Sequence, residues 1–540
     1  MCGAHFCAGA ERTIKVQNKY LNIPISHERE RSNLTFSAPG MDELKVQVRI
    51  SPEGEDYWVF KDISAYKGKI LTLSYDGSQQ ALDRLFQADT ICGSSAMYKE
   101  KLRPQYHFSS RRGWLNDPNG LVWHDGEYHL YYQHNPYERL WGNMHWGHAV
   151  STDLLHWEEY DDVLFPDKMG GMFSGSAVYD PDNTSGFGNK KTSPLVYAYT
   201  SAAGKMQKQC IAYSLDKGRT LVKYRNNPVI DSWDAWQTKE TRDPKLLWYA
   251  PGKHWVMVLY EKDGQSFYTS DNLKDWTYRS HIRGFYECPD LFELPVDGNR
   301  NNKKWVLMGA SGTYMIGDFD GMTFTPQGGK YRYTAGRGYA YQTVSGMPDG
   351  RVVQIAWGRV DMPDMPFNNE MLLPTELSLK TTVDGIMLCS NPVRELDSIM
   401  KRCFTSVRPM NAREASKAMK EFEKADCLHI RTTIQLSHST FAGIDLDGQK
   451  IVNFDSNQNL LNNFFFFLQD PRSLSLSVDI YIDRASVEVF ADGGLFSYSM
   501  LRRPEGNQLG FRFWGREDIT VTELIVDRVD SIYNSRDNAK

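Results

Sequence analysis

Hydrophobic and polar residues alternate in short runs along most of the chain, a pattern typical of strands with one or both faces buried. Examples are GEYHLYYQH (126–134), HWVMVLYE (254–261) and RVVQIAWGR (351–359), each bounded by turn-forming residues. Long amphipathic helical patterns are almost absent, and the best one is AREASKAMKEFEK (412–424). The pattern therefore predicts an all-β protein.

A short motif recurs in the middle of the chain. Ser151–Trp157 (STDLLHW) is echoed by Ser270–Trp276 (SDNLKDW), and weaker copies begin at Ser214 and Gly317. The copies start roughly 50–60 residues apart, close to the length of one four-stranded propeller blade. At that period the segment 104–385 accommodates a five-bladed β-propeller. Chance recurrence of turn residues is the alternative interpretation.

The segments on either side of the repeats also consist of short strand patterns. Residues 11–100 predict a small N-terminal accessory β-domain, with runs such as KVQVRIS and DYWVFKDIS. Residues 390–540 alternate apolar and polar positions, as in LSVDIYIDRASVEVFAD, and predict a C-terminal β-sandwich domain. Within it, the aromatic run from Phe464 to Phe467 is interpreted as a buried strand and not as a ligand platform.

Composition narrows the class of protein. A chain of 540 residues is too long for one ordinary core, and 41% apolar with 24% charged residues is typical of a globular protein. Aromatic residues reach 13%, which fits a carbohydrate binder because sugar rings stack on aromatic faces, although a large β core also uses them. The net charge of −5 provides no basic field and argues against a nucleic-acid partner.

The cysteine and histidine positions give no sign of a metal site. The eight cysteines are scattered without a CxxC pair, so neither a zinc site nor a dense disulfide framework is supported. His134 and His145 lack metal-ligand spacing, and no cofactor or metal is expected. No run of 18 apolar residues encodes a membrane span.

Three acidic motifs carry the candidate chemistry. They are WLNDPNG, TRDP and YECPD, which contain Asp117, Asp243 and Glu287. Turn-forming neighbours flank Asp117, so we expect its carboxylate to project from a strand end and not to pack in a core. Because the first strand of each propeller blade lines the central channel, the three carboxylates can converge although they are far apart in sequence. Each motif alone is weak, since Asp-Pro also begins ordinary turns.

These motifs, taken in order, resemble those of glycoside hydrolase family 32, the invertases, inulinases and levanases. The resemblance extends from Tyr106 to about Asp527. Besides the acidic motifs it includes YYQHNP (131–136), WGHAVSTDLLHW (146–157), FSGS (173–176) and DRASVEVF (483–490). The family fold is a five-bladed propeller followed by a β-sandwich. This agrees with the fold predicted from the sequence repeats and from the alternation of apolar and polar residues.

The resemblance implies a role for each acidic residue. Asp117 matches the nucleophile, which attacks the anomeric carbon of a terminal fructose, and Glu287 matches the acid/base. These roles need Asp117 ionised and Glu287 protonated, and a retaining mechanism places the two carboxyl groups ~5–5.5 Å apart. Asp243 matches the third carboxylate, which grips fructose hydroxyls and stabilises the transition state. Arg242 is expected to orient its acidic neighbours.

The resemblance also implies the residues that surround the sugar. Contacts to hydroxyls are expected from Asn116, Gln133 and Ser174, and the walls of the pocket from Trp114, Trp141 and Phe173. Core packing is the alternative for each aromatic residue.

The sequence departs from the family at two places beside the expected site. Tyr286 stands where the family often has Trp, and Arg337–Gln342 (RGYAYQ) replaces a usual DFYAAQ stretch. Tyr339 is retained there as an expected substrate contact, but the rim of the pocket is altered.

The expected activity is that of a retaining β-fructofuranosidase on levan or inulin, with sucrose as a further substrate, acting in exo mode and releasing fructose. An endo-acting fructanase is an open alternative. A fructosyltransferase is another, because no residue decides between water and a sugar as acceptor. A pentose-releasing relative with the same propeller is disfavoured by WLNDPNG and ECPD. A non-catalytic fructan-binding protein is disfavoured because a pure binder needs neither a nucleophile nor an acid. Linkage preference and oligomeric state are not written in the sequence.

The cellular location follows from the substrate more than from the start of the chain. MCGAHFCAGA lacks the charged and long apolar parts of a signal peptide, which taken literally indicates the cytoplasm. An enzyme that acts on a polymeric substrate usually works outside the cytoplasm. We therefore expect a bacterial periplasmic or extracellular protein whose export signal is not visible here, with a cytoplasmic location as the alternative.

Overall fold

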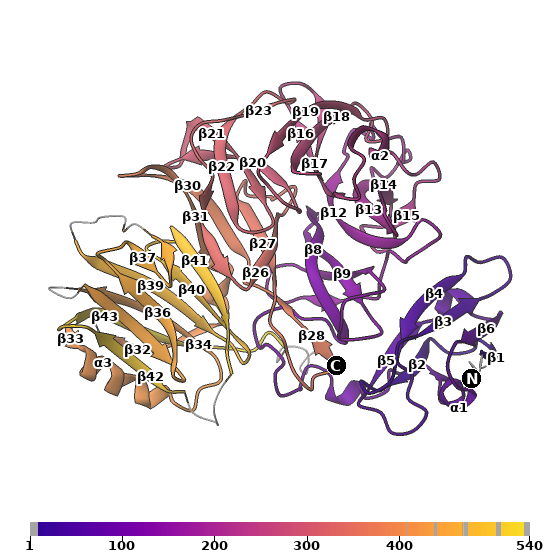
Figure 1. Cartoon of the computed structure of the whole chain (residues 1–540), viewed down its shortest axis with the longest axis horizontal. Coiled ribbons are helices and arrows are strands. Elements are labelled where there is room, and N and C mark those ends of the chain that lie inside the picture. The colour runs from indigo at the N-terminus through magenta and orange to yellow at the C-terminus, as the bar shows by residue number, and fades with distance from the viewer. Residues whose placement is uncertain are drawn as a thin grey trace, which may run out of the picture.

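The computed structural model is made mostly of strands, as expected (Figure 1). It describes residues 9–406, 408–436, 440–466, 468, 473–503 and 509–533. The α-helices in these ranges are short: α1 (Gln79–Asp83), α2 (Trp233–Trp236) and α3 (Ala412–Met419). The helix predicted within 412–424 is confirmed as α3, which begins with a capping box between Asn411 and Glu414. In the described ranges no helix has the length and apolar character that crossing a bilayer requires.

Residues 10–88 form two small sheets around a hydrophobic cluster that also includes Tyr137 from the middle of the chain. In β4 (Leu44–Val48), Leu44, Val46 and Val48 are buried while Lys45 and Gln47 face outward, which is the alternation expected of a strand with one face in a core. The first sheet has the order β1 (Ala10–Lys15), β6 (Ile70–Tyr75), β3 (Ser32–Ser37), β4, and the second has the order β5 (Tyr57–Asp62), β2 (Tyr20–Ile25), β7 (Phe86–Ala88).

The middle of the chain contains antiparallel strand groups that follow one another in sequence. The first three are β8 (Gly113–His124), β9 (Glu127–Asn135), β10 (His145–Ser151) and β11 (Glu158–Glu159), with β28 (Phe367–Asn368) added beside β8; β12 (Gly171–Tyr179), β13 (Leu195–Ala203), β14 (Met206–Ser214) and β15 (Val222–Lys223); and β16 (Thr241–Tyr249), β17 (His254–Glu261), β18 (Gly264–Ser270) and β19 (Thr277–Arg283).

Two further strand groups are joined into one ten-stranded sheet by a parallel bridge between Val296 and Leu379. One group is β20 (Asp290–Val296), β21 (Asn299–Gly309), β22 (Thr313–Phe319) and β23 (Phe324–Pro326). The other is β26 (Gly338–Thr343), β27 (Val352–Gly358), β30 (Thr375–Thr382) and β31 (Gly385–Pro392). Short strands β24 (Tyr331–Arg332) and β29 (Glu370–Met371) pair beside them.

The first strands of these five groups contact one another in a closed cycle. β8 contacts β12, β12 contacts β16, β16 contacts β20, β20 contacts β26, and β26 contacts β8 again. The groups are drawn from purple to orange in the upper part of Figure 1. The closed cycle brings segments that are up to 230 residues apart in sequence to a common centre.

The recurring sequence motif occupies the same structural position each time. Its copies follow β10, β14, β18 and β22, the third strands of four successive groups. In the two strongest copies the Trp157 and Trp276 indoles donate to the carbonyls of Leu154 (2.9 Å) and Leu273 (3.2 Å), and both leucines have positive φ. The repeat is thus a turn signal, with Asp or Asn side chains accepting from the turn's backbone.

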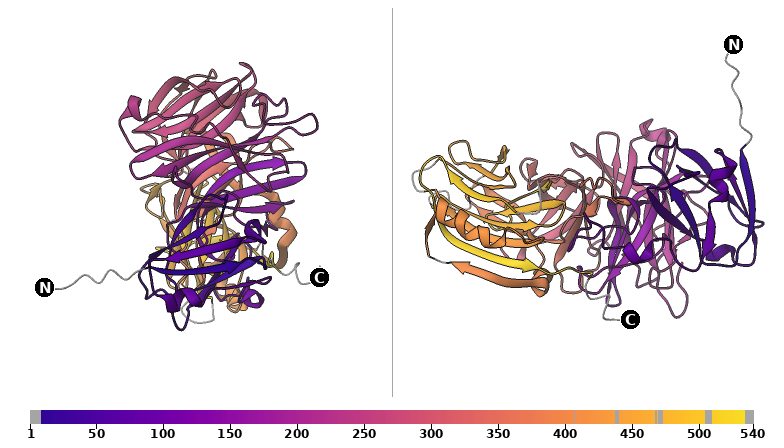
Figure 2. Two further views of the ribbon diagram at one scale, coloured as in Figure 1. Left: turned by 90° about the vertical axis from the view of Figure 1, so that its right-hand side faces the viewer. Right: turned by 90° about the horizontal axis from the view of Figure 1, so that it is seen from below.

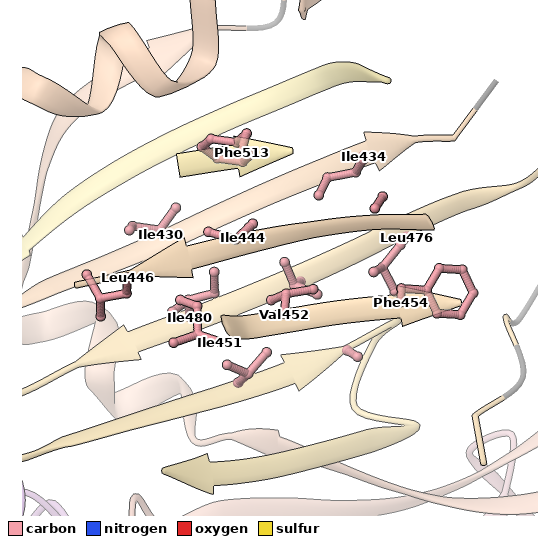
Figure 3. Close-up of a cluster of buried hydrophobic side chains, with 14 of the residues drawn as sticks. Ile430, Ile434, Ile444, Leu446, Ile451, Val452, Phe454, Leu476, Ile480 and Phe513 are labelled. Carbon is pink, nitrogen blue, oxygen red and sulfur yellow. The ribbon is translucent and has the colours of Figure 1, made fainter. Parts of the chain in front are cut away.

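The C-terminal part contains two sheets that share one hydrophobic cluster. Figure 3 shows side chains from both sheets, among them Ile430, Ile480, Ile444 and Phe513. The larger sheet has the order β25 (Thr334–Gly336), β41 (Phe496–Leu501), β40 (Ser486–Ala491), β39 (Ser475–Ile482), β34 (Leu428–Gln435), β43 (Thr520–Val529), β32 (Met400–Ser406), with β33 (Met410–Asn411) beside β43; the smaller has the order β38 (Phe464–Phe465), β37 (Leu460–Leu461), β36 (Gln449–Asp455), β35 (Phe441–Leu446), β42 (Phe511–Gly515).

The aromatic run at Phe464 is only partly buried, so the interpretation of it as a buried strand is wrong in part. Phe466 is 3% exposed, but Phe465 is 78% exposed. Successive residues of a strand point to opposite faces, and while Phe464 and Phe466 contact the hydrophobic cluster, Phe465 between them faces away from it. Phe467 lies outside the described residues.

The N-terminal and C-terminal sheets lie at opposite ends of the middle part (Figure 2). The junction with the C-terminal sheets is polar. The carboxylate of Asp483, the first residue of the DRASVEVF motif, accepts from the backbone N–H groups of Gln105 (2.8 and 2.9 Å) and Tyr106 (3.1 Å). This motif therefore helps to join the two parts of the chain.

Candidate active site

Irregularities in the central strands set the direction of the candidate side chains. The pairing register breaks between Leu115 and Pro118 in β8, between Met172 and Gly175 in β12, and between Arg242 and Lys245 in β16. A fourth break lies between Tyr339 and Gln342 in β26. Such bulges turn side chains out of the regular alternation and are frequent beside active sites. Asp117 therefore lies inside a strand at a bulge, and the expectation of a strand end was wrong.

Unusual backbone angles occur at the same level of the structure. Asp243 has φ +64°, and the consecutive residues Glu287 and Cys288, just before β20, have φ +46° and +39°. Residues other than glycine seldom adopt positive φ, and clusters of such residues occur where surrounding structure holds a functional conformation. Gly175 ends the bulge in β12, where an added Cβ would collide with the carbonyl oxygen of Ala198.

These features bring the carboxylates of Asp117 and Asp243 to one thiol. The Sγ atom of Cys288 lies 3.7 Å from Oδ2 of Asp117 and 3.5 Å from Oδ2 of Asp243. The backbone N–H of Cys288 also donates to Asp243 (3.2 Å), and Ser174 Oγ donates to Asp117 (2.6 Å). Because the thiol has one proton, it can donate to only one of the two carboxylates at a time.

Arg242 connects this pair to the third carboxylate. Its Nε and Nη2 donate to Oε1 of Glu287 at 3.0 and 2.7 Å, and its Nε lies 3.9 Å from Oδ2 of Asp243. The other oxygen of Glu287 accepts from the Tyr339 hydroxyl at 2.6 Å. The structure thus brings together Asp117, Ser174, Arg242, Asp243, Glu287 and Tyr339.

Burial and crowding of like charges shift the titration of the site. Burial raises the pKa of Asp117, hydrogen bonds from Ser174 and Asn116 lower it, and the Glu287 charge raises it again. Burial likewise raises the pKa of Asp243, against the lowering effect of Arg242. The pKa of Arg242 is raised, because the carboxylates outweigh the effect of burial, so this cation remains charged.

The aromatic residues expected to wall the site lie near it in two groups. The Trp141 ring, 53% exposed, meets Phe173 edge to face with centroids 6.0 Å apart. Trp114 packs on Trp357 at 5.9 Å, and Trp357 in turn packs on Tyr339 at 6.2 Å. The first group carries an exposed ring face, whereas the second packs around the tyrosine that holds Glu287.

Two of the polar residues expected to contact sugar make hydrogen bonds within the protein. The Asn116 amide oxygen accepts from the indole N–H of Trp114 (2.8 Å), and the side chain is 6% exposed. The Gln133 amide donates to the carbonyl of Met172 (2.9 Å), next to Phe173. Gln133 therefore holds β12 in place through its amide N–H.

Three further residues in the site received no role from sequence reasoning. Cys288 joins two carboxylates, Tyr286 Oη accepts from Arg242 (3.1 Å), and Gln207 Oε1 accepts from Nη1 of the same arginine (3.2 Å). Cys288 and Tyr286 are adjacent to Glu287, and that adjacency was the available signal. For Gln207, which lies in β14, the sequence offered no signal of a role in the site. Within the described part of the chain, no three His, Cys, Asp or Glu side chains gather as metal ligands.

Comparison with known proteins finds the same family across most of the chain. A family model described as the glycosyl hydrolases family 32 N-terminal domain matches residues 107–392, and one described as family 32 C terminal matches residues 417–528. The levanase of Bacillus subtilis (strain 168) is 38% identical over 506 residues, covering 84% of this chain and 74% of that protein. An extracellular exo-inulinase of Aspergillus niger is 34% identical over 504 residues, covering 76% and 92%.

A solved structure agrees with these matches. The crystal structure of an exo-inulinase from Aspergillus awamori superimposes with a TM-score of 0.72 at 28% identity, covering 81% of this chain and 99% of that one.

Proposed function

Because the chain belongs to family 32 of the glycosyl hydrolases, we propose that it is a fructan hydrolase that cleaves β-fructosidic bonds with retention, using Asp117 as nucleophile and Glu287 as acid/base. One observation carries the assignment of residues: three carboxylates from distant parts of the chain meet around Cys288 and Arg242. A retaining glycosidase needs two such carboxyl groups on opposite sides of the scissile bond.

In the first half of the reaction a carboxylate oxygen of Asp117 attacks the anomeric carbon of fructose. Glu287 gives its proton to the departing glycosidic oxygen, so the bond to that oxygen breaks as the bond to Asp117 forms. The hydrogen bond from Ser174 to Asp117 orients the nucleophile. Asp243 accepts hydrogen bonds from the hydroxyls of the reacting ring and stabilises the transition state.

In the second half Glu287 takes a proton from water, and that water attacks the anomeric carbon of the fructosyl–Asp117 ester. The bond to Asp117 breaks, fructose leaves, and Glu287 is again protonated. Arg242 and Tyr339, each bonded to one oxygen of Glu287, keep its carboxyl group aimed at the bond through both steps. The two carboxyl groups are predicted to lie ~5–5.5 Å apart in the substrate complex.

The closed cycle of β8, β12, β16, β20 and β26 supports a five-bladed β-propeller as the catalytic domain, within 104–385. The two sheets that share one cluster support a C-terminal β-sandwich within 390–540. The hydrophobic cluster of residues 10–88, which Tyr137 joins from the middle of the chain, supports an accessory N-terminal β-domain within 11–100. In this arrangement the site lies at one mouth of the propeller channel.

The substrate is a levan or inulin chain, which the names of the levanase and exo-inulinase relatives support, and sucrose is a further substrate. Attack is from the chain end, because inner strands that converge around one site leave room for a terminal ring. Substrate chains of this size support a location outside the cytoplasm.

The experiment is turnover of levan, inulin and sucrose by the wild type and by Asp117→Asn and Glu287→Gln. Each isosteric change removes one reacting group, so each variant should lose several orders of magnitude in kcat while its Tm stays near that of the wild type. A variant that keeps more than about a tenth of the rate, a loss of only ~1.4 kcal/mol, would refute the role of that residue.

A further inference from the structure

A hollow lies beside the carboxylate site, where the N-terminal sheets meet the first two strand groups of the middle part. It has a volume of about 350 Å³, in the range of ligand-binding clefts. Its lining includes Lys45 from β4, Trp141 and Asn143 from the β9–β10 loop, Phe173 from β12 and Gln207 from β14. Lys45 belongs to the N-terminal sheets, so this hollow is not made by the propeller strands alone.

The hollow adjoins the proton-donating side of the site. Gln207 accepts from Nη1 of Arg242 at 3.2 Å, and the same arginine holds Glu287 through Nε and Nη2. Under the proposed mechanism Glu287 protonates the departing oxygen. The part of the substrate that carries this oxygen therefore leaves past Arg242 and Gln207, toward the hollow.

The N-terminal domain is fixed firmly enough to contribute a binding residue. The backbone N–H and C=O of Gln47 both bond the amide of Asn143, at 2.8 and 2.7 Å, as a neighbouring strand would. The Tyr137 ring, from the same loop as Asn143, lies inside the N-terminal hydrophobic cluster at 1% exposed.

Ion pairs add to this contact. Arg31 donates to the buried carboxylate of Glu138 (2.7 Å) and to the carbonyl of Trp141 (3.2 Å). The loop that carries Trp141 is therefore held from the N-terminal side, and Lys45 of β4 lines the same hollow as Trp141.

The lining suits a neutral sugar unit. The exposed Trp141 ring offers a face on which a sugar can stack, and Phe173 supports that ring from the side. The Lys45 ammonium and the Gln207 amide N–H groups offer donors for hydroxyl oxygens, since the Gln207 amide oxygen already accepts from Thr241 and Arg242. The aromatic face gives an uncharged polyhydroxyl ligand contact area, and the polar groups around it fix the orientation of the ligand through hydrogen bonds.

We propose that this hollow is a distal subsite for a fructosyl unit on the leaving-group side of the chain, and that the N-terminal β-domain completes it through Lys45. The proposal rests on the proposed function. Sucrose places a single unit beyond the bond that is cut, whereas a fructan places several units there and can fill the hollow. The N-terminal domain would thus favour polymers over sucrose.

The test is the ratio of KM for fructan to KM for sucrose, measured on the full chain. Lys45→Ala removes the donor from the N-terminal side and should raise this ratio about five-fold, the effect of one lost hydrogen bond, with little change in kcat. Ala202→Phe, at a hollow-lining residue of β13, fills the space without altering the N-terminal domain and should raise the ratio at least as much. Lys69→Ala, at an exposed lysine of the same domain outside the hollow, is the matched control and should leave the ratio unchanged.

The outcomes separate the possibilities. Ratios within two-fold of wild type for both Lys45→Ala and Ala202→Phe would refute the subsite. A change with Ala202→Phe alone would refute the contribution of the N-terminal domain. A wild type that releases no sugar from levan, inulin or sucrose would instead refute the proposed function, so the two failures are distinguishable.

Discussion

The junction between the middle and C-terminal parts contains a carboxyl group whose titration should control stability. The Glu370 side chain is fully buried, and a hydrogen bond with the Ser486 side chain lowers its pKa. It lies near His107, which bridges Asp483 (2.8 Å) and Glu488 (2.9 Å). Burial raises the pKa of Glu370 to about 7, and the Asp483 charge raises it while the His107 cation lowers it.

Glu370→Gln keeps the shape of the side chain and removes its ionisation. Below pH 4.5 the wild-type carboxyl is protonated in both the folded and unfolded chains. Because its pKa is higher in the folded chain, the stability associated with it is lost as pH rises from 4.5 through about 7. The difference of about 2.5 pKa units corresponds to roughly 3 kcal/mol. The free energy of unfolding of the variant should therefore increase relative to that of the wild type, by up to that amount, as pH rises from 5 to 8.

The assay is urea unfolding at several pH values from 5 to 8, followed by tryptophan fluorescence, with the free energy of unfolding compared between the two proteins at each pH. Glu43→Gln, at an exposed carboxyl group, is the control and should show a constant difference. A constant difference for Glu370→Gln, or one that moves in favour of the wild type with rising pH, would refute the reasoning.

Three further outcomes are expected. Cys288→Ala removes a donor that lowers the pKa of Asp117, so the acid limb of the kcat/KM profile should move to higher pH; an unchanged limb would mean that the thiol does not act on the nucleophile. Activity should survive EDTA, since the mechanism uses only carboxyl groups and protons, and a complete loss that metal reverses would contradict it. The earliest product from levan or inulin should be fructose alone, and chromatography that shows oligosaccharides of several lengths first would overturn exo attack.

Much of the fold could be predicted because it depends on local patterns. The alternation of apolar and polar residues predicted the strands. The recurring turn motif, which is Ser-x-Asp or Ser-x-Asn in three of its copies and begins at Gly317 in the fourth, marked equivalent positions at the ends of β10, β14, β18 and β22. The exposure of Phe465 could not be predicted, because an unbroken run of phenylalanines does not show which of them faces away from the core.

The sequence motifs predicted that three distant carboxylates converge, but not the backbone that brings them together. The motifs named Asp117, Asp243 and Glu287, whereas the bulges and positive φ angles that aim them depend on pairing between strands. The contact of Cys288 with two carboxylates depends on that same backbone. That Lys45 and Trp141 line one hollow depends on how the N-terminal sheets pack against the middle part of the chain, and no local pattern encodes it.

The configuration of the first product tests the central claim most directly. A fructosyl–Asp117 intermediate requires two displacements at the anomeric carbon, so the fructose released first should have the β configuration of the bond that was cut. Rapid NMR of a concentrated enzyme reaction can record this anomer before mutarotation. Initial accumulation of the β anomer is the predicted result, and initial accumulation of the α anomer would contradict the assignment of Asp117 as the nucleophile.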